Sequence, residues 1–275
     1  MCTLDGCGTH KNMPPIKLTD TDRRAFLAGA ITLPLATVLA FPEMAAAQGA
    51  KMTALEIPAG TGGKAQGVIA MPAKLPAPVV VLIHEWWGLN DQIKAMAVEL
   101  ANLGYIAYAI DLYEGEVATT PDEARALMNF IDEDDATAQL AAAVKHLREM
   151  EGSNGKIGTI GWCFGGGWSL KASIAAPVDA TVVYYGYVRF DAKKLSSLSG
   201  PVMGHFGDLD TWINKEMVDG FEQEMGKAGK DESLSVNWYA ADHAFANPSS
   251  ARYDAEDAAL AWSRTKAFFT ENLKG

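Results

Sequence analysis

The amino-acid sequence predicts an α/β protein with a mostly parallel central sheet and helices on both faces. Apolar runs rich in Val, Ile and Tyr alternate with segments of helical periodicity, which is the pattern of successive βαβ units. The run at 78–84, PVVVLIH, is almost continuously apolar, as is typical of a strand buried on both faces of its sheet. No glycine-serine, proline-rich or single-charge stretch divides the body of the chain, so residues 48–275 are expected to form one domain.

The predicted elements follow one another in a regular order. Two short segments at 52–59 and 64–72 come first and are expected to pair as a hairpin on the sheet edge. Strands are then expected at 78–84, 105–113, 156–161, 180–186, 201–207 and 234–241. Helices are expected at 90–104, 119–131, 134–150, after the glycines at 165–167, and from about 255 to 273. Gly104 suits the C-terminal end of the first helix, and Thr120 with Pro121 suits the start of the second.

Residues 1–47 have the layout of an export signal. Arg23 and Arg24 form a twin arginine, an apolar run extends from 25 to about 41, and a stretch of small residues ends at Ala47. The pattern DRRAFLAG resembles a twin-arginine (Tat) signal, which predicts a periplasmic or exported protein, cleavage after Ala47 and transient contact with the Tat machinery. The alternative is a membrane-anchoring helix, but the run contains prolines and is short for the roughly 20 apolar residues that spanning requires.

Removal of this segment defines the mature composition. The segment carries four basic and four acidic residues, so the formal net charge of −11 is unchanged. This acidity argues against nucleic acid as a partner, and contact with a membrane is expected only through the signal. Cys2 and Cys7 are also lost, which leaves Cys163 as the only cysteine and excludes an internal disulfide. Neither a nucleotide fingerprint nor a metal-ligand spacing occurs in the sequence, so no cofactor or metal is expected.

Polar side chains with chemical potential follow the predicted strands at their carboxyl ends. Ligand sites of parallel sheets lie just beyond that edge. The residues concerned are His84, Glu85, Trp86, Trp87, Cys163, Asp208, Asp210, Asp242 and His243. The sequence therefore predicts one functional site at the carboxyl edge of the sheet.

Cys163 occupies the centre of the pattern G-W-C-F-G between a predicted strand and a predicted helix. G-x-S-x-G at such a turn is typical of a hydrolase nucleophile elbow, in which a tight turn exposes the nucleophile. Gly161 and Gly165 are expected because side chains two residues to either side of the nucleophile would collide with the turn. The start of the following helix favours a thiolate.

A nucleophile of this kind needs a base and an acid that orients the base. His243 follows the last strand and is the best candidate for the base, in the chain order nucleophile, acid, histidine. His146 is expected on a helix surface, while His84 and His205 are expected to be hydrogen-bonded structural residues. The candidates for the acid are Asp208 and Asp210 in GDLD, and whichever is not the acid is expected to be a turn aspartate that caps the helix near Ile213.

The motifs together resemble the dienelactone hydrolase family, which has the α/β-hydrolase fold. The matching segments are IHEWWGLN, DLY, GWCFGGG, GDLD and HAF, which occur in the family's order over residues 52–273. The glutamate after the third strand, combined with G-x-C-x-G-G, is the specific part, because glutaminase-type amidotransferases also contain G-x-C-x-G. The resemblance implies a hydrolase of lactones or carboxylic esters that forms a thioester intermediate.

The resemblance also implies roles for individual residues. Cys163 would be the nucleophile, His243 the base and Asp210 the orienting acid, since the family's acid stands third after the glycine matched by Gly207. Glu85 would match a buried glutamate that pairs with the resting thiol and helps to convert it to thiolate; an exposed loop carboxylate is the alternative.

Backbone groups and aromatic side chains would complete the site. The backbone N–H groups of Phe164 and Trp86 would form the oxyanion hole. Some of the nearby aromatic residues are expected to line the substrate pocket and others to pack in the core: Trp87, Tyr113, Tyr185 and Phe245.

The sequence departs from the family at two places where dienelactone-cleaving members have arginines that hold the substrate carboxylate. Glu114 and Glu116 follow DLY here, and Asn247 stands in the histidine loop. A small-molecule lactone or ester is therefore expected as substrate, with dienelactone the less favoured choice. A thiol amidase, peptidase or thioesterase and a non-catalytic exported binding protein are the alternatives.

Overall fold

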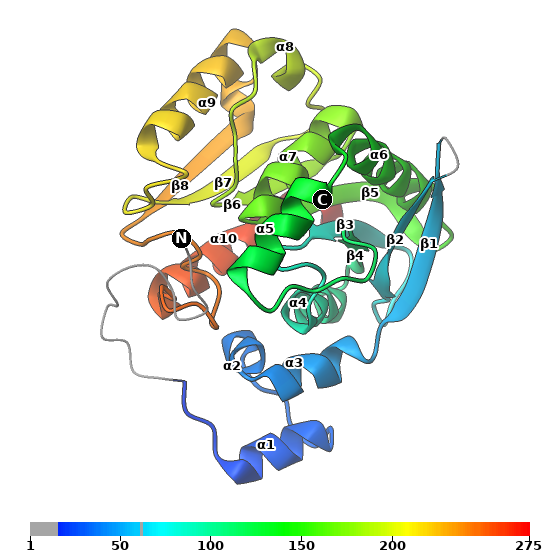
Figure 1. The fold of residues 1–275 in the computed structure, drawn as a ribbon. Coiled ribbons are helices and arrows are strands. Elements are labelled where there is room, and N and C mark those ends of the chain that lie inside the picture. Colours follow the sequence, from blue (N-terminus) through cyan, green and yellow to red (C-terminus); the bar gives the residue numbers. More distant parts are fainter. Residues whose placement is uncertain (1–15, 61–62) are drawn as a thin grey trace.

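The computed structural model describes residues 16–60 and 63–275, which contain an eight-stranded sheet in the order β1-β2-β4-β3-β5-β6-β7-β8 (Figure 1). β1 and β2 form the antiparallel hairpin at the sheet edge, and β2 also pairs antiparallel with β4. The remaining pairs are parallel. The strands are β1 (Thr53–Ala59), β2 (Gly63–Ala70), β3 (Ala77–Ile83), β4 (Ile106–Asp111), β5 (Ser153–Trp162), β6 (Ala180–Tyr184), β7 (Val202–Gly207) and β8 (Leu234–Tyr239). The predicted fold class is confirmed.

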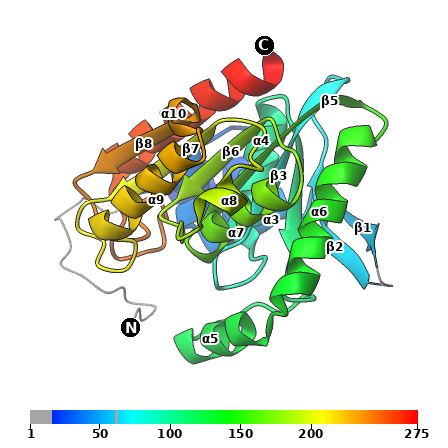
Figure 2. The same cartoon turned by 90° about the horizontal axis from the view of Figure 1, so that it is seen from above.

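Helices cover both faces of the sheet, as Figures 1 and 2 show. α4 (Asp91–Asn102) and α10 (Ala255–Lys274) pack on one face. The opposite face is covered by α6 (Glu133–Glu149), α7 (Phe164–Ala175) and α9 (Lys215–Lys227). β3 is buried at each of its seven positions, which accounts for its continuous apolar run.

Most helix boundaries follow from capping groups in the sequence. The Asn90 side chain accepts the Ile93 N–H at the start of α4. Thr120 and Glu123 form a reciprocal capping box at the start of α5 (Pro121–Phe130). α8 (Ala192–Leu195), a single turn, is not among the predicted helices, because four residues are too few for a periodic pattern.

The described part of the N-terminal segment is helical and packed. It forms α1 (Asp20–Leu27), α2 (Leu35–Ala40) and α3 (Pro42–Gly49); α2 and α3 pack against α4, and α1 packs against α3 (Figure 1). The 25–41 run is thus divided between short helices, and no helix within the described residues has the length and apolarity needed to cross a membrane. Residues 16–47, which the signal prediction separates from the domain, contribute buried side chains to its core in the uncleaved chain.

Candidate active site

Cys163 lies at the sharp turn between β5 and α7. Its backbone has φ 55° and ψ −116°, which is strained for any residue other than glycine. The chain can pass so closely only because side chains are missing on either side. A Cβ on Gly161 would collide with the Gly165 carbonyl, and a Cβ on Gly165 would collide with the carbonyl oxygens of Ile83 and His84. The turn therefore has the geometry that the glycine pattern predicts.

Cys163, Asp210 and His243 come together at the carboxyl ends of β5, β7 and β8. His243 Nδ1 lies 2.7 Å from Asp210 Oδ2, and the imidazole also lies within interaction range of the Cys163 thiol. Both members of the Asp210–His243 pair are buried, with 4% and 5% of their surfaces exposed. Asp208 is exposed, and hence Asp210 is the aspartate that reaches the histidine.

Asp210 has a second role that was expected of its neighbour. Its Oδ1 accepts hydrogen bonds from the backbone N–H groups of Trp212, at 2.8 Å, and Ile213, at 3.0 Å. The same carboxylate therefore caps the turn and holds the histidine, and the expectation that the other aspartate caps the following helix is wrong, because Asn214 caps α9. The physical reason is that a carboxylate has two oxygens and enough lone pairs for all three donors.

Electrostatics within this cluster favour a protonated histidine. Burial lowers the pKa of His243, but the charge of Cys163 and the hydrogen bond to Asp210 outweigh it and raise the pKa to about 10. Burial raises the pKa of Asp210, yet the hydrogen bonds and the charge of His243, with the two backbone N–H groups, bring that pKa below its usual value. The Asp210 carboxylate and any negative charge on Cys163 thus stabilise His243 as an imidazolium.

Glu85 is buried beside the cluster, with 6% of its surface exposed, so it is not a loop carboxylate in solvent. Its carboxylate accepts a hydrogen bond from Asn247 Nδ2 at 2.7 Å, whereas the resemblance implies a pair with the thiol. Burial raises the pKa of Glu85, and His243 and Asn247 offset this increase only in part. An amide N–H is a stronger hydrogen-bond donor than a thiol S–H, so Asn247 satisfies the buried carboxylate better than the thiol would.

The N–H groups of Trp86 and Phe164 are free to donate. Phe164 is the first residue of α7, where the backbone N–H has no acceptor within the helix. Within 16–60 and 63–275, no hydrogen bond from either N–H is present. Both residues line the same cavity as Cys163.

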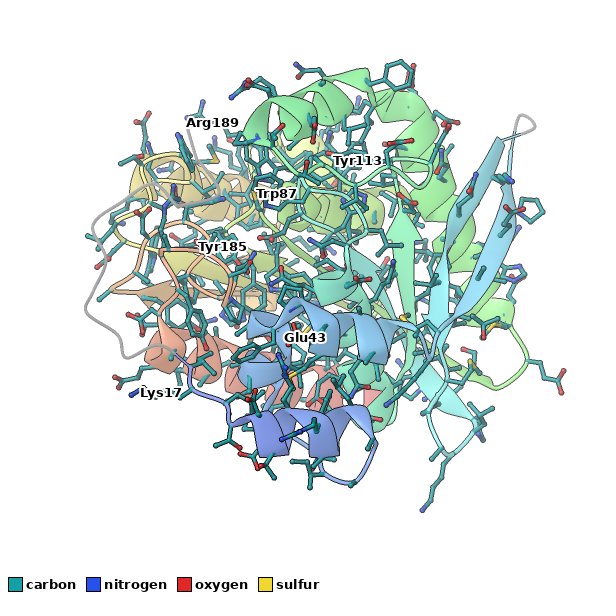
Figure 3. All side chains as sticks on the ribbon, turned by 60° about the horizontal axis from the view of Figure 1, so that its bottom comes forward. Lys17, Glu43, Trp87, Tyr113, Tyr185 and Arg189 are labelled. Atoms are coloured by element: carbon teal, nitrogen blue, oxygen red, sulfur yellow. The ribbon has the colours of Figure 1, made fainter. Side chains whose placement is uncertain are left out.

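The cluster opens into a cavity of about 940 Å³. Trp86, Trp87 and Tyr185 line this cavity, and Figure 3 labels Trp87 and Tyr185 in this region. Tyr113 and Phe245, by contrast, do not line the cavity. Phe245 is fully buried against Tyr185, and Tyr113 packs against the ring of Phe164, so these two are among the aromatic residues that pack in the core. Both side chains turn from the sheet edge into the core.

Arg252 is a pocket residue that the sequence analysis missed. Its guanidinium stacks over the Trp212 ring at 5.0 Å and donates to the His243 carbonyl oxygen at 3.3 Å. Trp212 in turn contacts the His243 ring edge-on at 5.2 Å. Nothing in the motif pattern marks Arg252, because it stands nine residues after His243 in an irregular loop.

The other histidines are as expected. His84 is buried between the Glu85 carbonyl and the Leu112 N–H, and His205 is buried between Tyr239 and Thr265. His146 is exposed on α6. In the part of the chain that the structure describes, no group of three His, Cys, Asp or Glu side chains is arranged to hold a metal ion.

Comparison with known proteins identifies relatives of this arrangement. Residues 65–273 match the sequence model of the Dienelactone hydrolase family. The chain is 34% identical to Protein usf of Aquifex pyrophilus, over 77% of this chain and 95% of that protein. It is 32% identical to a carboxymethylenebutenolidase of Pseudomonas putida, over 73% and 89%. A solved dienelactone hydrolase-like promiscuous phosphotriesterase from metagenomic libraries superposes with a TM-score of 0.70 at 26% identity, covering 81% and 99% of the two chains.

Proposed function

Because the chain belongs to the dienelactone hydrolase family and is a hydrolase of lactones or esters, we propose that Cys163 is its nucleophile. The observation that supports this most is the placement of Cys163 at a strained turn beside a buried His243–Asp210 pair. A lone structural cysteine needs neither the strain nor the pair. The proposal is therefore a cysteine, histidine and aspartate triad that forms a thioester.

In the proposed reaction, the Cys163 thiolate attacks the carbonyl carbon and forms a carbon–sulfur bond. The tetrahedral oxyanion rests on the backbone N–H groups of Phe164 and Trp86. The carbon–oxygen bond then breaks, and the alkoxide leaves with the proton of the His243 imidazolium. Neutral His243 next takes a proton from water, whose oxygen attacks the thioester and releases the acid, with the sulfur leaving as thiolate.

Asp210 and Glu85 assist without bonding to the substrate. Asp210 holds Nδ1 of His243, which leaves Nε2 for the proton transfers. Glu85 lines the same cavity as Cys163, and its raised pKa suits a carboxylate that takes up the proton of the resting thiol. A substrate that displaces Asn247 from Glu85 would free the carboxylate for this step.

The test is whether the sulfur of Cys163 becomes acylated by an ester. The purified protein should gain the mass of the acyl group on Cys163 when it is mixed with 4-nitrophenyl acetate and quenched in acid. Cys163→Ala should lose both the adduct and hydrolysis while keeping its circular dichroism spectrum, and iodoacetamide should inactivate the wild-type protein. Hydrolysis by Cys163→Ala at the wild-type rate would exclude the proposal.

We also propose that residues 1–47 direct export through the Tat route. The twin arginine Arg23-Arg24 and the small residues before Gln48 support this. The expected mature protein begins at Gln48, which N-terminal mass analysis of a periplasmic fraction would detect. Replacing both arginines by lysine should retain the uncleaved protein in the cell interior, and an unchanged distribution of the protein would contradict a Tat signal.

A further inference from the structure

We propose that the substrate is a neutral ester with a long apolar group, which lies along a wall formed by α5 and the residues that flank it. This inference rests on the proposed function and names the substrate class for the same site. The wall is defined by Val117, Met128 and Ile131, and it faces the same cavity as Cys163.

The wall is apolar yet incompletely covered. Val117 is 43% exposed and Met128 is 38% exposed, although both line the cavity. Ala124 is the one fully buried residue of α5, and Figure 2 shows this helix projecting from the edge of the molecule. Exposed apolar side chains that border a cavity next to a nucleophile are typical of a site for an apolar ligand.

The wall is fixed to the loop that carries the aromatic residues of the site. The Ala118 N–H donates to the Trp87 carbonyl at 2.9 Å, and the rings of Trp86 and Trp87 are 5.0 Å apart. A ligand along α5 would therefore contact the same loop that supplies the Trp86 N–H. The cavity volume of about 940 Å³ leaves room for far more than a small lactone.

The charges around the cavity favour a neutral substrate. The Lys and Arg side chains that line it within the described residues already have acidic partners: Arg125 with Asp122 at 2.7 Å, Lys171 with Glu133 at 2.8 Å, and Arg252 with Asp242 at 3.6 Å. A substrate carboxylate would have to compete for them. Glu114 and Glu116, just before the wall, add negative charge at its start.

The experiment compares 4-nitrophenyl esters from acetate to decanoate. A buried methylene is worth about fourfold in binding, so kcat/KM should rise by about two- to fourfold for each methylene between butanoate and octanoate. Met128→Glu should lower the ratio of kcat/KM for octanoate to that for acetate by about tenfold or more. Phe130→Glu is the matched control, because Phe130 lies on the same helix but is 87% exposed and does not line the cavity. It should leave that ratio within about twofold.

A second readout does not depend on turnover. Octanoate ester should quench the tryptophan fluorescence of Cys163→Ala at lower concentration than acetate ester does, and adding Met128→Glu should remove this difference while Phe130→Glu keeps it. Equal kcat/KM across the series, or preference for 4-nitrophenyl hemisuccinate over the neutral butanoate, would overturn the substrate class while leaving ester hydrolysis in place. If Met128→Glu and Phe130→Glu changed the octanoate-to-acetate ratio equally, the proposal that the wall binds the apolar group would be refuted. Loss of the proposed function would instead appear as hydrolysis that survives in Cys163→Ala.

Discussion

Replacing Asp210 by asparagine tests the proposed triad with the smallest change in shape. The carboxylate accepts His243 Nδ1–H at 2.7 Å through one oxygen and two backbone N–H groups through the other. An asparagine can keep the backbone bonds with its carbonyl oxygen, so the turn should survive. Its NH₂ group would then face Nδ1, which must become an acceptor, and the imidazole would carry its proton on Nε2, facing Cys163.

The size of the effect follows from the interaction that is lost. A hydrogen bond between charged groups contributes about 1.5–3 kcal/mol, which corresponds to roughly 10- to 150-fold in rate. The misplaced proton adds to this loss, and the same change in the serine-protease triad, a different protein, costs about 10⁴-fold. We therefore expect kcat/KM of Asp210→Asn to fall by about 10²- to 10⁴-fold at pH 8. The pKa of His243 should also fall, because one cause of its increase is removed.

The assay is hydrolysis of 4-nitrophenyl acetate across pH 5–10, with the rate of iodoacetamide labelling measured in parallel. Asp208→Asn is the control, because Asp208 is exposed and its N–H, rather than its side chain, bonds to the Tyr239 carbonyl. It should keep wild-type kinetics. Wild-type activity in Asp210→Asn, or an equal loss in Asp208→Asn, would refute the role given to Asp210.

Two further predictions concern the turn and the imidazole. Gly165→Ala should destabilise the protein by about 2–3 kcal/mol, because the new Cβ collides with the Ile83 carbonyl. Gly220→Ala has open space around its Cβ and should stabilise α9 by up to about 1 kcal/mol. Urea denaturation measures both changes. The reverse order of stability would contradict the steric argument. Cys163→Ala should lower the pKa of His243 from about 10, since the charge of Cys163 is the largest of the influences that raise it; NMR titration of the ring should show deprotonation at lower pH, and an unshifted curve would contradict the ion pair.

Patterns within single elements made most of the fold and the triad predictable. A buried parallel strand has a continuous apolar run, and a tight strand-to-helix turn needs glycines, so β3 and the Cys163 turn are marked locally in the sequence. The chain order then placed Asp210 and His243 at the same sheet edge. Choosing Asp210 over Asp208 depended on a resemblance, because two aspartates in one turn look alike until the register of the loop is known.

Contacts between irregular loops were not predictable. Asn247 donates a hydrogen bond to Glu85 from a position 162 residues away in the sequence. Arg252 stacks on Trp212, which is also distant in the sequence. No periodicity encodes such pairs. The helical pattern of α5 identifies an amphipathic helix, yet it does not say that Met128 borders a cavity while Phe130 faces solvent, because that depends on where the helix is anchored.

Backbone strain offers an independent reason to regard the sheet edge as a built site. Four non-glycine residues in the described chain have positive φ: Glu114, Cys163, Tyr185 and Ala244. Conformations of this kind cost about 1–3 kcal/mol each and persist only where surrounding structure enforces them. Cys163 carries the thiol, Tyr185 lies against His243 at 5.1 Å, Ala244 follows His243, and Glu114 begins the segment that leads to the α5 wall. A scaffold selected only for stability would not concentrate backbone strain on these segments. The positions of the strained residues therefore favour a preorganised site that includes the wall as well as the triad.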